Sequence, residues 1–186
     1  MEYLYHVVPK DMVGSQLIPL NNLKVSQPEI YKKEIAKYND HPQRKRLPNT
    51  KIPKLDCLWN DVVQLCPIHP NMIYQGWVYV GKTISRSLQF FQIPITEIQD
   101  KPTAIYHYDP DHTVGTPFKD KNFELIRVED YKELTALPNK TLKWYQLLHE
   151  EGKFGAHFHA MPHIMVKGNV NISHSRIIDW KEAPAT

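Results

Sequence analysis

The sequence predicts an α+β fold made of short elements. Fifteen prolines and only seven glycines in 186 residues argue against a bundle of long helices and favour short elements joined by stiff connections. Segments rich in aromatic and β-branched residues, typical of strands, alternate with segments whose apolar residues recur at helical spacing. With 41% hydrophobic and 23% charged residues, the chain can bury a core, and we expect a single domain over residues 1–186.

Net charge and cysteine content exclude few functions. A net charge of +3 is compatible with an anionic substrate but is too small to require a nucleic-acid partner. Cys57 and Cys66 are too few for a disulfide framework or a cysteine-based zinc site, so we expect reduced core residues. No stretch approaches the roughly 20 apolar residues of a membrane span. We therefore expect no membrane partner and a cytoplasmic location.

The first expected element is a strand over Tyr3–Val8, where aromatic and β-branched residues dominate. Alternation of side chains along a strand places His6 on the same face as Leu4 and Val8. Two interpretations of His6 are open. It is either a core histidine bonded to a backbone carbonyl or a histidine that contacts a ligand from a central strand.

A helix is expected over residues 28–38. Ser26 fits its N-cap, and Glu29, three residues later, would complete a capping box. The loop after this helix holds Arg44 and Arg46 in the most basic run of the chain. Such a run indicates either a solvated surface or a contact with phosphate groups.

The segment 52–74 is the second informative region. Polar residues such as Asn60 interrupt its apolar run and need hydrogen-bond partners if they are buried. Pro67 and Pro70 bracket His69, whose backbone is restricted because it precedes a proline. This restriction suits either a positioned side chain or a plain rigid turn.

The remaining elements follow from the same patterns. Further strands are expected at 87–93, 103–108, 163–166, near 170–172 and at 176–180, and further helices at 71–80, 128–137 and 139–151. Asn71 is the expected N-cap of the helix over 71–80.

Three histidines, His157, His159 and His163, lie close together near the C-terminus. In an extended chain His157 and His159 would share one face. Their spacing is similar to that of cupin metal sites, where neutral imidazoles bind a divalent metal, with His163 as a further ligand. The other interpretations are an acid/base histidine in a nucleotide pocket and surface histidines on a loop.

Three segments of the chain resemble, in their order, the layout of DarT-type ADP-ribosyltransferases, which use NAD to modify DNA bases. These segments are Tyr5-His6, residues 65–74 (LCPIHPNMIY) and residues 160–170 (AMPHIMVKGNV). The resemblance spans most of the chain by order. It implies a split, mixed β-sheet with flanking helices, NAD as cofactor, and a nucleotide or nucleic acid (DNA or RNA) as partner. For a toxin of this type it also implies an antitoxin or immunity partner.

The chain departs from that family at two motif positions. Ile68 and His69 stand where the family has an arginine, and His163 stands where it has the catalytic glutamate. A carboxylate supports the oxocarbenium-like charge as nicotinamide leaves, and an imidazole is a poor substitute. The tRNA 2′-phosphotransferases of the same superfamily react with NAD through histidine and arginine residues. The resemblance is therefore compatible with a histidine-based site.

Together these observations predict a catalytic site formed by His6, His69 and His163, whose imidazoles can transfer protons near neutral pH if they converge. The expected cofactor-binding residues offer stacking, hydrogen-bonding or charged groups: Tyr5, Trp59, Asn60, Arg44 and Arg46. Three alternatives stay open. They are a metal-independent nuclease or phosphodiesterase with a histidine pair, a cupin-like metal-binding protein, and a non-catalytic interaction module.

Overall fold

The structure is a computed structural model that describes residues 1–40, 42, 44–113 and 116–184. Its strands are β1 (Tyr3–Val7), β2 (Gln16–Leu17), β3 (Lys51–Ile52), β4 (Cys57–Leu58), β5 (Val62–Leu65), β6 (Gln89–Pro94), β7 (Thr103–Tyr106), β8 (Phe123–Leu125), β9 (His163–Lys167), β10 (Val170–Asn171) and β11 (Arg176–Asp179). Its α-helices are α1 (Leu20–Ser26), α2 (Pro28–Ala36), α3 (Pro70–Tyr79) and α4 (Asn139–Glu150). The 3-10 helices are η1 (Lys37–Asp40), η2 (Arg44–Asn49), η3 (Pro53–Leu55), η4 (Trp59–Asp61), η5 (Ile95–Ile98), η6 (Asp120–Asn122) and η7 (Val128–Asp130).

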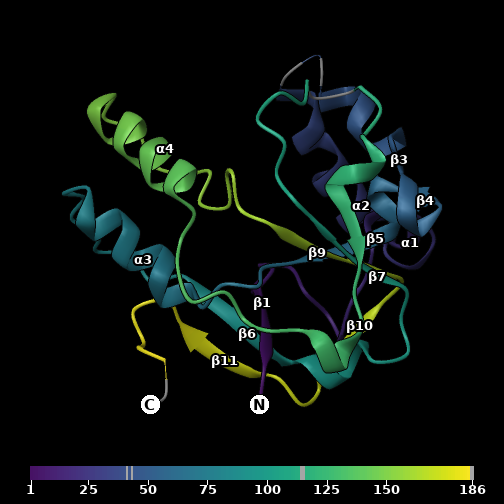
Figure 1. Cartoon of the computed structure of the whole chain (residues 1–186). Helices are drawn as coiled ribbons and strands as arrows, with labels where there is room; N and C mark the ends of the chain where they lie inside the picture. Colours follow the sequence, from purple (N-terminus) through teal and green to yellow (C-terminus); the bar gives the residue numbers. More distant parts are fainter. Residues whose placement is uncertain (41, 43, 114–115, 185–186) are drawn as a thin grey trace.

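Two antiparallel sheets form the centre of the protein (Figure 1). One has three strands in the order β1-β6-β11, and the other has four in the order β5-β9-β7-β8. β2 pairs with β10 and β3 pairs with β4 as two short additional ladders. A bridge between Tyr5, in β1, and Cys66, just after β5, joins the two sheets. The sheet is therefore split, with β1 and β5 as the two strands that face the split.

The expected α+β class is confirmed by this combination of helices and antiparallel sheets. The expectation that strands of both directions mix in the sheet is wrong for the described ladders, all of which are antiparallel. Parallel pairing occurs only as an isolated bridge between Ile68 and Leu134 in the described residues. Antiparallel neighbours do not need the crossover connections that parallel neighbours require.

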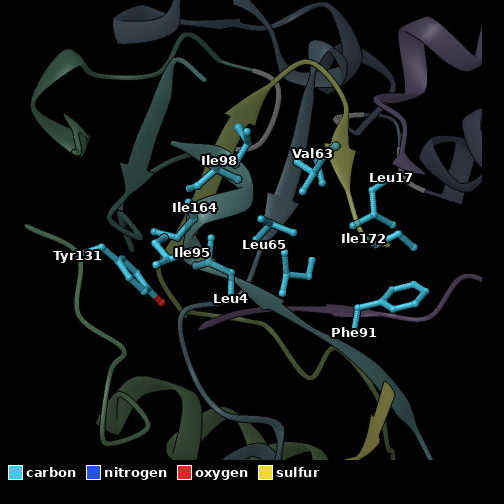
Figure 2. Packing of buried hydrophobic residues seen from close by; sticks show 13 residues of the cluster. Leu4, Leu17, Val63, Leu65, Phe91, Ile95, Ile98, Tyr131, Ile164 and Ile172 are labelled. Atoms are coloured by element: carbon cyan, nitrogen blue, oxygen red, sulfur yellow. The ribbon is translucent and has the colours of Figure 1, made fainter. Parts of the chain in front are cut away.

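One face of both sheets shares an apolar core, shown in Figure 2. Leu4 of β1, Leu65 of β5 and Ile164 of β9 point into this core, and Ile95 and Ile98 of η5 close it. Leu4, Leu65 and Ile164 are completely buried. Because burying such a side chain stabilises the fold by about 1.5–3 kcal/mol, this core holds the two sheets together beneath the split.

The opposite faces of the two sheets pack against different partners. Tyr5 of β1 belongs to a cluster with Trp77 of α3 and Tyr145 of α4, so these two helices cover the three-stranded sheet. Met165 of β9 belongs to another cluster, which includes Ile52 of β3. α3 and α4 lie together on one side of the protein, and α1 and α2 lie on the other (Figure 1).

The helix expected at 128–137 is wrong beyond its first turn, because η7 ends at Asp130. Tertiary hydrogen bonds hold the residues that follow. Tyr131 donates its hydroxyl to the Tyr3 carbonyl at 2.9 Å, and the Tyr3 amide donates to the Glu133 carboxylate at 2.7 Å. The Leu134 amide donates to the Pro67 carbonyl at 2.8 Å. These bonds to distant segments replace the local bonds of a helix.

Two expected helix caps are also wrong. Ser26 is the last residue of α1, where its hydroxyl donates to the Asn22 carbonyl at 3.0 Å, and α2 starts after Gln27 without a side-chain cap. α3 is capped by His69, whose ring nitrogen accepts from the Asn71 amide. Asn71 instead uses its side chain to bind the carbonyls of Trp180 and Lys181.

Both cysteines are buried and free, as expected for reduced core residues. Across the described ranges, we find no helix with the length and apolar character needed to cross a membrane.

Candidate functional site

A cleft opens where β1 and β5 separate. Tyr5 and Cys66 exchange two backbone hydrogen bonds, of 2.9 and 2.8 Å, and close one end of the split. If the strands continued as a ladder, Val7 would lie opposite Gln64 in the next hydrogen-bonded pair. No backbone hydrogen bond joins Val7 to Gln64 in the described part of the chain. Both residues line the cleft instead.

The edges of this cleft carry open backbone groups. In a strand, the amide and carbonyl of alternate residues point to the same side. Because Tyr5 and Cys66 point theirs toward each other, Val7 and Gln64 also point theirs into the split. A ligand that enters the split therefore meets amide donors from two strands and the carbonyl of Gln64, whereas the Val7 carbonyl already accepts from the His6 ring.

His6 lies at this edge. Its Nδ1 is 2.6 Å from the Val7 carbonyl oxygen, which can only accept, so Nδ1 carries the proton. Burial lowers the pKa of His6, and its ring is neutral at pH 7. This leaves Nε2 with a free lone pair that can accept a hydrogen bond or a proton. His6 thus bonds to a backbone carbonyl and also lines the cleft, and its contact with a ligand stays a prediction.

The cleft is large enough for a dinucleotide. Its volume is about 810 Å³, at the upper end of the roughly 300–1,000 Å³ typical of small-molecule sites. α1 and α2 contribute Leu20, Leu23 and Ile30 to its wall, and β5 contributes Val62 and Val63. These two valines point to opposite faces of β5. Because both line the cleft, the cleft lies along the β5 edge of the four-stranded sheet and not on one of its faces.

A polar network forms the wall next to η4. Asn60 is 3% exposed, and its Oδ1 accepts from the Tyr38 hydroxyl at 3.1 Å. Its Nδ2 is buried and has no acceptor among the described residues. Asp61 fixes this turn, because its carboxylate accepts from the Leu58 amide at 2.7 Å and from the Asn21 side chain at 2.6 Å.

Charged side chains border the cleft on the side of α2 and η2. Lys10, Lys33, Lys37 and Arg44 are the described cationic lining residues, and Asp11 and Glu34 are the acidic ones. Lys33 pairs with Asp11 at 2.9 Å, which lowers the pKa of that carboxyl group. Lys37 pairs with Glu34, and Arg44 pairs with Asp40. Because these pairs are exposed to solvent, each is weak and can give way to an anionic ligand.

Four of the residues predicted from the sequence line this cleft: His6, Arg44, Trp59 and Asn60. The other four do not belong to its described lining: Tyr5, Arg46, His69 and His163. Tyr5 is 1% exposed and donates its hydroxyl to Glu133 at 2.8 Å, so it is a core residue at the closed end of the split. Arg46 is exposed on η2.

His69 serves the packing of α3. Its Nδ1 accepts from the Asn71 amide at 3.2 Å, and its ring lies edge-on to the Tyr5 ring at 5.2 Å. Burial lowers the pKa of His69, with Glu182 acting weakly in the opposite direction. This matches the rigid-turn interpretation of the Pro67–Pro70 segment.

His163 begins β9 on the other face of the sheet from His6. Ile164, the next residue, points into the same core as Leu4, and Leu4 lies on the same face of β1 as His6. Because successive side chains of a strand alternate, His163 points to the opposite face. The Nδ1 of His163 faces the Met161 carbonyl at 2.9 Å, and burial lowers its pKa. The expected gathering of His6, His69 and His163 around one pocket therefore does not occur in the fold.

The alternative metal site at His157, His159 and His163 is also not formed. Residues 157–160 make a turn rather than an extended segment, and φ is positive at Ala156, just before the turn (47°), and at Ala160, its last residue (60°). The two rings pack against different partners, His157 against Trp77 and His159 against Trp144. The described residues contain no group of three or more His, Cys, Asp or Glu side chains placed to hold a metal ion.

His157 is held neutral among aromatic rings. The indole nitrogen of Trp77 donates to its Nδ1 at 3.0 Å, and Arg86 lies 3.2 Å from its Nε2. Because Nδ1 accepts from Trp77, Nε2 carries the proton of the neutral ring. Burial together with the Arg86 charge lowers the pKa of His157 to about 4. His159 instead lies against Trp144, with ring centroids 4.2 Å apart.

Sequence reasoning missed several residues of the cleft. Tyr38 was expected only as the last residue of the helix over 28–38, and Gln64 was not singled out, yet both line the cleft. A signal existed for Gln64, since it is the one polar residue in the strand-like run Val62–Leu65. Lys10 offered none, because a lone lysine after a strand is usually solvated.

Comparison with known proteins adds no relative: no family model matches the sequence, no curated protein matches it, and no solved structure matches the fold.

Proposed function

We propose that this protein binds NAD in the cleft between β1 and β5 and acts, as an ADP-ribosyltransferase-type protein, on NAD and/or a nucleic acid. The resemblance to DarT-type enzymes motivates the choice of NAD, and the geometry of the cleft supports it. Nucleic acid as acceptor and an antitoxin or immunity protein as partner belong to the same proposal and rest on the resemblance alone.

The observation that carries the proposal is the split itself. Two strands that are joined at Tyr5 and Cys66 diverge and leave a cleft of about 810 Å³ that reaches from their open backbone edges to a row of cationic side chains. A dinucleotide carries groups that complement both parts of the cleft, a carboxamide for the backbone edges and phosphates for the cationic side chains. The buried Nδ2 of Asn60, which has no acceptor in the described protein, indicates that a polar ligand completes this wall.

His6 is the histidine that this cleft offers for a histidine-based reaction. Its neutral ring, protonated at Nδ1, presents Nε2 as a base. In that role it would take a proton from an acceptor hydroxyl or amine as the bond to nicotinamide breaks. His163, at the position of the family's glutamate, lies on the opposite face, and its catalytic role stays a prediction.

The alternatives have less support. A nuclease with a histidine pair needs two imidazoles within reach of one phosphate, and His6 is the only histidine in the described lining of the cleft. A cupin-like site needs metal ligands, which the turn at 157–160 separates. A non-catalytic module with the same cleft differs from the proposed enzyme only in turnover, so it is an outcome of the experiment below.

The test is a thermal-shift titration with NAD, ADP-ribose and short oligonucleotides, followed by measurement of nicotinamide release. A ligand that binds only the folded protein at 100 times its Kd stabilises it by about 2.7 kcal/mol, which raises Tm by about 5–10 °C for a chain of this size. We expect this shift with NAD and ADP-ribose. Binding without nicotinamide release, with and without oligonucleotide, would identify a module rather than an enzyme.

Three histidine variants sharpen the test. His6→Ala should lower nicotinamide release by at least about 100-fold, the usual contribution of a general base. His107→Ala is the matched control, because His107 is exposed just after β7 and does not line the cleft. His163→Ala is predicted from the sequence to abolish activity, and from its position it should leave NAD binding intact. The absence of any shift with NAD and ADP-ribose would refute the proposal.

A further inference from the structure

The side-chain amide of Asn60 is half satisfied. Its Oδ1 accepts from Tyr38 at 3.1 Å, whereas its Nδ2 is buried without an acceptor in the described residues. A buried donor left without a partner costs about 1–3 kcal/mol, so native proteins rarely keep one unless a ligand or water completes it. Since Asn60 lines the cleft, a bound molecule can supply the missing acceptor.

The orientation of this amide is fixed by its neighbours. Burial raises the pKa of the Tyr38 hydroxyl, which therefore keeps its proton. The hydroxyl donates that proton to an oxygen of Asn60 at 3.1 Å. This assigns Oδ1 of Asn60 to the Tyr38 side and turns Nδ2 toward the rest of the wall.

A cation stands at the same end of the cleft. The guanidinium of Arg44 lies 5.3 Å above the centre of the Tyr38 ring, and Arg44 is part of the lining. Its ion pair with Asp40 joins side chains that are 39% and 57% exposed. Such a pair is cheap to break, and a guanidinium binds phosphate oxygens through two parallel hydrogen bonds.

The two ends of the cleft thus differ in chemistry. The end at Val7 and Gln64 offers neutral backbone groups, whereas the end at Asn60 and Arg44 offers two side-chain donors, one of them a cation in a solvent-exposed ion pair with Asp40. We propose that Asn60 and Arg44 form the phosphate-binding end of the cleft, where Asn60 Nδ2 donates to a phosphate oxygen of the nucleotide and Tyr38 positions Asn60. This assignment rests on the proposed function, because the nucleotide is the ligand of that same cleft.

The test compares ligands with and without phosphate. Calorimetric titrations of the full chain with ADP-ribose, adenosine and inorganic pyrophosphate are made on the wild type and on Asn60→Asp. This change keeps the size of the side chain but replaces the donor by a negative charge. ADP-ribose and pyrophosphate should bind about 10- to 100-fold more weakly, the effect of losing one charge-assisted hydrogen bond. Adenosine should bind as it does to the wild type.

Matched variants separate this effect from folding. Asn139→Asp makes the same chemical change at an exposed position of α4, away from the cleft, and should leave all affinities unchanged. Tyr38→Phe removes the hydroxyl that orients Asn60 and should weaken ADP-ribose but not adenosine, a selectivity that a general loss of packing would not produce. If Asn60→Asp does not fold, Arg44→Ala carries the same comparison.

The outcomes distinguish this inference from the proposed function. Wild-type affinity of Asn60→Asp, or of Arg44→Ala in its place, for ADP-ribose would overturn the phosphate assignment and leave NAD binding standing. If the wild type binds neither NAD nor ADP-ribose, the proposed function fails, and the pyrophosphate titration then tests the phosphate subsite on its own. Pyrophosphate binding that depends on Asn60 would still support the subsite, and its absence would overturn the subsite as well.

Discussion

Tyr5 and Cys66 are joined by two backbone hydrogen bonds, but the next pair that an antiparallel ladder would bond, Val7 and Gln64, is not joined. The chain could have continued the pairing, since both segments are extended. Instead His6 turns its ring to the Val7 carbonyl at 2.6 Å. The cleft exists because the ladder stops at this point.

Hydrogen exchange should report this broken ladder directly. In the free protein we expect slow exchange at the amides of Tyr5 and Cys66 and fast exchange at those of Val7 and Gln64, which point into the cleft. The Val8 amide, which donates to the Gln89 carbonyl at 2.9 Å, is the internal control and should be protected throughout. Slow exchange at Val7 and Gln64 in the free protein would mean that the split is closed in solution.

Glu133 fixes the start of β1, and its replacement should destabilise the fold. Its two carboxylate oxygens accept from the Tyr3 amide and the Tyr5 hydroxyl, at 2.7 and 2.8 Å. Glu133→Gln leaves one oxygen for two donors and turns an NH₂ group toward one of them. We expect a loss of about 1–3 kcal/mol in the free energy of unfolding.

Urea denaturation measures this loss. Glu129→Gln is the control, because Glu129 is exposed in η7 and its nearest cation, on Arg127, is 3.8 Å away. That variant should stay within about 0.5 kcal/mol of the wild type. Equal stability of the two variants would mean that Glu133 does not hold β1.

His157 should make stability depend on pH. Burial, and after it the Arg86 charge, lowers the pKa of His157 from its ordinary value of 6.5 to about 4 in the folded protein. Between these values the unfolded chain binds a proton that the folded protein does not, so stability falls as the pH falls. The loss from this residue approaches about 3 kcal/mol at pH 4.

The variant His157→Gln isolates this contribution. Glutamine keeps an oxygen that can accept from the Trp77 indole, and it does not titrate. Urea denaturation at pH 7 and at pH 4.5 should show a smaller difference for the variant than for the wild type. An equal difference in both proteins would mean that His157 titrates normally in the folded state.

The sequence predicted elements better than it predicted contacts. The strands at 3–8, 87–93, 163–166 and 176–180 and the helix at 139–151 all appear with small shifts of their ends. Their patterns are local, since side-chain alternation and helical spacing need no knowledge of neighbours. The helix at 128–137 failed because the partners of Tyr131, Glu133 and Leu134 lie in distant segments that no local pattern reveals.

The candidate site was predictable only in part, for the same reason. His6, Arg44, Trp59 and Asn60 share the cleft although they come from three separate segments. His163 failed to join His6 because alternation starts β9 on the opposite face, and the relative register of two strands cannot be read from either strand alone. The metal site considered at His157, His159 and His163 does not form, because the left-handed backbone at Ala156 and Ala160 makes a turn where an extended segment was expected.

The most direct test of the account is a calorimetric titration of the wild-type protein with NAD, repeated with His6→Ala and with His107→Ala. The account predicts one binding site in the wild type and the same affinity in His107→Ala. It predicts an affinity lowered by about 2- to 10-fold in His6→Ala, because Nε2 of His6, which lines the cleft, would no longer accept a hydrogen bond from the bound NAD. No heat of binding with the wild type, or wild-type affinity in His6→Ala, would contradict the assignment of the cleft between β1 and β5 as the NAD site.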